Sequence, residues 1–99
     1  MMISIDKKAY SWFAKEFEFE KPYSIRMFPQ YAGFGEKHKG YSLGFSIEAP
    51  TNAKYLKEIN GVTFYYEEND AWFFNDIETC LSIDKANELQ ISFKEPIMN

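Results

Sequence analysis

The chain has 99 residues, a net charge of −4, 45% hydrophobic residues and one cysteine. A chain of this length is expected to form a single domain that is stable without disulfides or metal. Its acidic balance and the lack of a long basic run argue against nucleic acid or a membrane surface as partner. No apolar stretch approaches the roughly 20 residues that span a bilayer, and the start lacks a signal-peptide pattern. These features predict a cytoplasmic location.

Local patterns predict a strand and then a helix at the start of the chain. Residues Met2–Ile5 have the composition of a short strand, and Asp6 is placed to cap a helix with its carboxylate. Apolar residues recur at four-residue steps from Ala9 to Phe17, which predicts a helix over residues 7–18 with one buried face.

From residue 23 onward the apolar period changes to two, which is the spacing of strands. Pro29 lacks an amide donor, which predicts an edge strand or a bulged one. Asn60 and Gly61 predict a hairpin with a type I′ turn, and Asp70 is placed to cap a short helical turn over residues 71–74. The predicted strands after the helix cover residues 23–30, 41–48, 54–59, 62–67, 77–83 and 89–93.

These elements predict a mainly β fold with an N-terminal helix, of the α+β class, arranged as one small mixed β-sandwich over residues 1–99. Their order, together with several short motifs, resembles the HesB-like family of A-type iron–sulfur carriers. The motifs are Ile25-Arg26-Met27, Tyr41-Ser42-Leu43, Asn60-Gly61-Val62 and the closing segment Ile91–Pro96. The resemblance implies the HesB-like sandwich or pseudobarrel and a relation to iron–sulfur cluster biosynthesis.

The cysteines that bind the cluster in this family do not occur at the matching positions. Phe34 stands between Gly33 and Gly35 where the family has a ligand cysteine, and the chain stops before the family's Cys-x-Cys tail. Clusters are usually held by four thiolates, and a dimer of this chain would offer two. The resemblance is therefore to a cysteine-poor branch, and we expect no cofactor, with iron or an iron–sulfur cluster as the alternative.

Two other residues are candidate ligands. His38 lies between Lys37 and Lys39, which would repel a cation, so a solvated loop histidine is the favoured interpretation. Cys80 shares a strand face with Glu78, and a nearby acid disfavours the reactive thiolate. A small packed residue is therefore the favoured interpretation of Cys80.

Trp72 and Phe73 are candidate interaction residues, because they follow an acidic segment and aromatic residues are enriched in binding hot spots. Packing in the core is the favoured alternative for a domain of this size. Beyond His38 with Cys80, no nucleophile and base can be paired, so we expect no enzyme.

The sequence thus predicts a non-enzymatic HesB-like protein that is related to iron–sulfur cluster carriers and has lost its cluster ligands. The alternative is a protein-interaction module on the same fold with no metal role. The expected partners are proteins, with iron–sulfur assembly components and a homodimer through the strand near Pro29 as specific options.

Overall fold

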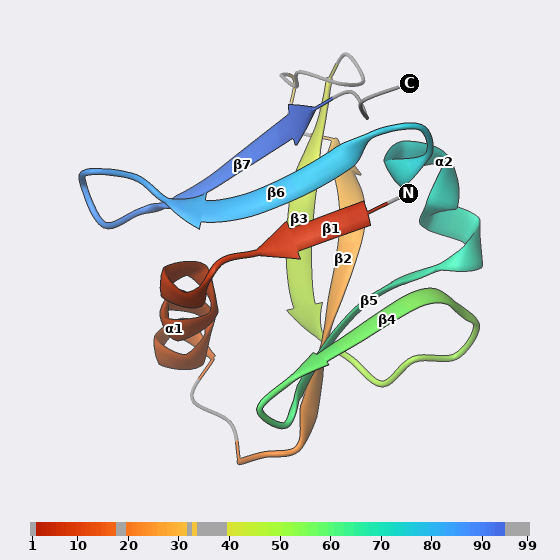
Figure 1. Ribbon diagram of the computed structural model, residues 1–99. Helices are drawn as coiled ribbons and strands as arrows, with labels where there is room; N and C mark the ends of the chain where they lie inside the picture. Colours follow the sequence, from red (N-terminus) through yellow and green to blue (C-terminus); the bar gives the residue numbers. More distant parts are fainter. Residues whose placement is uncertain (1, 18–19, 32, 34–39, 95–99) are drawn as a thin grey trace, which may run out of the picture. The chain divides into compact units, whose positions relative to one another are not determined.

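Strands make up most of the computed structural model, which describes residues 2–17, 20–31, 33 and 40–94 (Figure 1). The elements within these ranges confirm the predicted α+β class, mainly β with an N-terminal helix. They are β1 (Met2–Ile5), α1 (Lys7–Glu16), β2 (Tyr23–Tyr31), β3 (Tyr41–Ile47), β4 (Ala53–Ile59), β5 (Val62–Glu67), the 3₁₀ turn η1 (Glu68–Asp70), α2 (Ala71–Phe74), β6 (Glu78–Ile83) and β7 (Leu89–Lys94).

Contacts divide the chain into two compact units, one made of residues 1–18 and 74–99 and the other of residues 19–73. The predicted single domain over residues 1–99 and the predicted sandwich arrangement stay predictions. No helix in the described ranges is long and apolar enough to cross a membrane.

The first unit contains a three-stranded sheet in the order β1-β6-β7. Strand β1 runs parallel to β6, and β6 forms an antiparallel hairpin with β7 (Figure 1). Asp6 caps α1 as predicted, since its carboxylate accepts a hydrogen bond from the amide of Ala9 at 2.8 Å. The helix ends at Glu16 rather than Glu18, because Phe17 leaves the helical region with φ −112° and ψ 82°.

Buried side chains of the first unit come from α1 and β6, together with Ile3 on β1 and Phe74. Ala9 and Phe13 are buried on α1, four positions apart as predicted. On β6 the side chains of Thr79 and Leu81 are buried, whereas Cys80 between them is half-buried. The period of two therefore assigned the faces of this strand correctly.

The second unit contains a four-stranded sheet in the order β3-β2-β5-β4. Strand β2 pairs antiparallel with β3 and parallel with β5, and β5 pairs antiparallel with β4. The predicted type I′ hairpin between β4 and β5 is confirmed, because Asn60 and Gly61 both have positive φ, at 48° and 86°.

Strand β2 is an interior strand, so the prediction of an edge strand at Pro29 is wrong. The pairing with β5 covers only residues 23–26, and Pro29 lies beyond it, paired on its other side with Leu43. The missing N–H of Pro29 is tolerated because no β5 residue is paired with β2 at that position. A homodimer through an edge at Pro29 therefore no longer follows from the strand order.

Strand β5 carries buried side chains on both faces. Val62, Phe64 and Tyr66 on one face and Tyr65 on the other are each at most 1% exposed. The hydroxyl of Tyr65 donates to the carbonyl of Glu48 at 2.9 Å. Desolvation by burial raises the pKa of Tyr65 and of Tyr66, so both phenols stay neutral over the physiological range.

Candidate protein-binding surface

The glycine loop that carried the resemblance to iron–sulfur carriers is described only at its base. Phe34, Gly35 and His38 lie outside the described residues. The amide of Gly33 donates to the carbonyl of Gly40 at 3.1 Å, and both glycines have positive φ, at 80° and 88°. This pair closes the connection between β2 and β3, a backbone conformation that favours glycine.

Cys80 lies on the middle strand of the first unit's sheet, in register with Ser4 and Ser92. Its thiol donates a long hydrogen bond of 3.5 Å to the carboxylate of Glu78. Within residues 2–17, 20–31, 33 and 40–94, no group of three or more His, Cys, Asp or Glu side chains is placed to hold a metal ion. The expectation that the protein carries no cofactor stays a prediction.

Trp72 and Phe73, which were both predicted as candidate interaction residues, have opposite environments. Phe73 is completely buried, whereas 45% of the Trp72 side chain is exposed. Successive residues of a helix point in directions about 100° apart, so the short helix α2 buries one ring and presents the other. Of the two residues, only Trp72 is accessible to a partner.

Trp72 belongs to a row of three aromatic rings, which we call the aromatic patch (Tyr31, Tyr41 and Trp72). The ring centroids of Tyr31 and Tyr41 are 5.5 Å apart, and those of Tyr41 and Trp72 are 5.6 Å apart. Both pairs meet edge to face, the arrangement that the ring quadrupoles prefer. Tyr31 is 73% exposed, so the row combines fixed geometry with a large accessible surface.

Strand pairing places the first two rings of the patch. Tyr31 ends β2 and Tyr41 begins β3, and they are partners in the antiparallel register. Gly40 leaves room for the Tyr31 ring, because a β-carbon at Gly40 would lie 2.7 Å from its Cε1 atom. The closed loop base therefore supports Tyr31 in its position.

An ion pair connects the strand β2 to the segment that carries the third ring. The guanidinium of Arg26 donates to the carboxylate of Asp70 at 2.8 Å, across 44 positions of the chain. Asp70 is the last residue of η1 and comes two positions before Trp72. The hydrogen bond to Asp70 raises the pKa of Arg26. The expectation that Asp70 caps the helical turn is wrong, because its carboxylate faces Arg26 instead.

The polar surroundings of Arg26 do not form an anion site. A second carboxylate, that of Glu48, lies 3.5 Å from the guanidinium. Arg26 and Glu48 line a small pocket of about 170 Å³, and Glu67 lines it too. Three hydrogen bonds from the turn at residues 51–52 occupy the Glu67 carboxylate. The positive charge of Arg26 is thus balanced by carboxylates of the protein itself.

The aromatic patch has the composition of a protein-binding hot spot. Tyrosine and tryptophan provide large rigid contact areas at a low cost in side-chain entropy, and they dominate measured binding energies. Sequence reasoning did not single out Tyr31 or Tyr41 as interaction residues: the predicted strand ended at residue 30, and Tyr41 was assigned to the next strand. The available signal was an aromatic residue at each end of the predicted β2–β3 connection, where antiparallel pairing brings the two together.

Comparison with known proteins shows the family. The chain is 34% identical over 82 residues to a protein of Bacillus subtilis (strain 168) named pyruvate dehydrogenase inhibitor, an alignment that covers 83% of this chain and 86% of the relative. The chain therefore belongs to the family of that inhibitor. No protein-family model matches the chain, and no solved structure matches it either.

This relationship overturns the assignment to HesB-like iron–sulfur carriers, and with it the predicted function and the predicted link to iron–sulfur cluster biosynthesis. The motifs behind that assignment were an Asn-Gly hairpin, a Tyr-x-Leu strand and an Arg-bearing strand. Each is an ordinary feature of small β-rich proteins, because turn geometry and strand alternation impose similar residues on unrelated chains. The ligand cysteines that would have been specific were not at the matching positions.

Proposed function

We propose that this chain is a non-catalytic regulatory protein that inhibits pyruvate dehydrogenase by binding to it. The observation that carries the proposal is the 34% identity, over most of both chains, to a protein named as an inhibitor of that enzyme. Pyruvate dehydrogenase replaces iron–sulfur assembly components as the proposed partner. The cytoplasmic location predicted from the sequence is part of this proposal.

The aromatic patch supports a mechanism by protein contact. Its rings are held by a strand register, by the loop base and by the Arg26–Asp70 pair, so little conformational entropy is lost when a partner covers them. We propose that Tyr31 and Trp72, the most exposed members, insert into the enzyme surface. Tyr41, whose ring contacts both of the others, holds them in place.

The test is an inhibition assay with purified pyruvate dehydrogenase of Bacillus subtilis, in which the rate of pyruvate oxidation is measured against the concentration of added protein. The unmodified chain is expected to lower this rate in a saturable way. Replacing a hot-spot aromatic typically costs about 2 kcal/mol of binding free energy, or roughly 30-fold in Kd. Tyr31→Ala and Trp72→Ala are therefore each expected to raise the half-inhibitory concentration by roughly that factor.

Leu56→Ala is the matched control, because Leu56 is also a large exposed hydrophobic residue (58%) but lies on β4, at the opposite edge of the sheet from β3. It should inhibit as the unmodified chain does. Circular dichroism of each variant checks that the fold is kept. A protein that binds no pyruvate dehydrogenase and leaves its rate unchanged would refute the proposed function. Equal inhibition by all three variants would refute the role of the aromatic patch but not the proposed function.

A further inference from the structure

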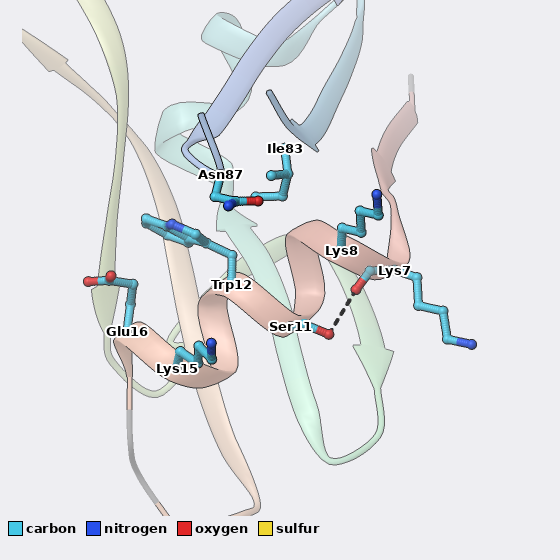
Figure 2. Close-up of a pocket in the computed structure, with 8 residues that line it drawn as sticks. All are labelled: Lys7, Lys8, Ser11, Trp12, Lys15, Glu16, Ile83 and Asn87. Carbon is cyan, nitrogen blue, oxygen red and sulfur yellow. Dashed lines mark hydrogen bonds between the residues drawn. The ribbon is translucent and has the colours of Figure 1, made fainter. Parts of the chain in front are cut away.

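A second surface lies in the other unit, along the outer face of α1. It is an open groove of about 780 Å³ between this helix and the residues around the β6–β7 turn. Figure 2 shows Trp12 and Lys8 extending from α1 toward the side where Ile83 and Asn87 lie. We call this surface the basic groove (Lys8, Ser11, Trp12, Lys15 and Ile83, with Lys7 at its margin).

The groove is positively charged although the chain as a whole is acidic. Three lysines and one glutamate line it, in a chain of net charge −4. None of the ion pairs found in the described part of the chain involves Lys7, Lys8 or Lys15. Their charges are therefore available to a partner of opposite charge.

An aromatic surface lies between the charges. Trp12 is half-buried, with its ring packed edge to face on the buried Phe13 at 5.1 Å between centroids. The indole of Trp12 therefore offers an apolar face and carries one N–H donor.

The spacing of these groups suits an extended peptide. Lys8, Ser11, Trp12 and Lys15 follow one another at three- and four-residue steps, which places them on one face of α1. Lys8 and Lys15 are then roughly 10 Å apart along the helix axis, because a helix rises about 1.5 Å per residue. Side chains of an extended chain alternate between its two sides, so residues that face the helix together are two or four positions apart, which is about 7 or about 13 Å. The flexible lysine side chains can adapt from about 10 to about 13 Å.

We propose that the basic groove binds an extended acidic segment of a partner protein, with two carboxylates four positions apart on Lys8 and Lys15 and an apolar residue midway between them on Trp12 and Ile83. Charge complementarity selects this occupant. Two copies of the chain repel each other, because both carry a net charge of −4. A small anion could engage one lysine but would leave Trp12 uncovered. The proposal does not depend on which enzyme the protein inhibits.

The experiment uses the full chain with Trp72→Phe, which leaves Trp12 as the single tryptophan and hence as a fluorescent reporter of the groove. The probe is a synthetic peptide of about eight residues with two glutamates four positions apart and a leucine midway between them. We expect saturable binding with a Kd on the order of 100 µM, because the contacts are exposed. Binding should weaken between about 0.1 and about 1 M salt, where the Debye length falls from about 10 to about 3 Å.

Charge reversal at Lys8→Glu with Lys15→Glu is expected to weaken peptide binding by about tenfold or more, because repulsion replaces two exposed attractions. Lys8→Gln with Lys15→Gln tests the same contacts if the reversal disturbs α1. The matched control is Lys57→Glu with Lys94→Glu, which changes the net charge equally at exposed positions outside the groove. This control should bind the peptide nearly as the parent does.

Three results would overturn the proposal. The first is equal binding by the groove variants and the control. The second is inorganic phosphate that competes fully with the peptide at similar concentration, which would indicate a non-specific anion surface. The third is an unmodified chain that sediments as a dimer while the groove variants sediment as monomers, which would assign the groove to a second copy of the chain.

Discussion

The Arg26–Asp70 pair should contribute measurably to stability, in contrast to an ordinary surface ion pair. Its N–O distance is 2.8 Å, and the two side chains are 30% and 14% exposed. Exposed pairs contribute about 0.2–1 kcal/mol, whereas removing one partner of a buried pair costs about 3–5 kcal/mol. The burial of this pair lies between these cases, so we expect Asp70→Ala to lower the free energy of unfolding by about 1.5 kcal/mol. For a chain of this size that corresponds to a loss of roughly 6–12 °C in Tm.

The assay is a double-mutant cycle in urea, followed by circular dichroism, with Asp70→Ala, Arg26→Met and the double variant. The Lys54–Glu68 pair provides an internal control, because its N–O distance is 3.8 Å and both side chains are 47% exposed. We expect a coupling energy of about 1–2 kcal/mol for the first pair and below about 0.5 kcal/mol for the control. Equal coupling energies would refute the argument that burial strengthens the Arg26–Asp70 pair.

Because Asp70 comes two positions before Trp72, Asp70→Ala should also weaken inhibition of pyruvate dehydrogenase under conditions where the variant is fully folded. Displacing the third ring of the aromatic patch is the expected cause. An unchanged half-inhibitory concentration in the folded variant would show that the pair stabilises the protein without positioning Trp72.

Two further predictions concern the same unit. The pKa of Glu67 is lowered, chiefly by the hydrogen bond from the Thr51 hydroxyl, so its stabilising contribution is present above its ordinary pKa of about 4.3 and is lost as the pH falls through the lower folded value. The Tm difference between the unmodified chain and Glu67→Gln should therefore shrink from pH 6 toward pH 3, and a constant difference would contradict this. Gly33→Ala should cost about 1–2 kcal/mol for its positive φ, while Gly40→Ala should cost more because its β-carbon would also displace the Tyr31 ring. Urea unfolding of the two variants measures both costs. Equal losses in the free energy of unfolding would refute the close approach between Gly40 and the Tyr31 ring.

Sequence patterns predicted local structure well because the information is local. Alternation assigned the faces of β6, the Asn60–Gly61 pair fixed a hairpin, and Asp6 capped the helix that it precedes. In each case the responsible side chains lie within a few residues of the structure that they determine. The same local character explains the wrong family assignment, since short turn and strand motifs recur in unrelated β-rich proteins.

The candidate site depended on contacts between distant parts of the chain. The parallel pairing of β2 with β5 made β2 an interior strand, although Pro29 suggested an edge. Arg26 and Asp70 are 44 positions apart, and neither carries a sequence signal that indicates the other. Trp72 and Phe73 are neighbours of similar chemistry, and only packing around α2 decided which ring is buried.

The sequence by itself thus determined the secondary structure, the acidic charge and the α+β class, because these follow from residue type and from spacing along the chain. The tertiary structure decided which aromatic rings form the exposed patch and which partner Arg26 has. It also showed that the lysines of α1 line an open groove. Those properties depend on which segments meet in space, and the spacing of residues along the chain does not specify this.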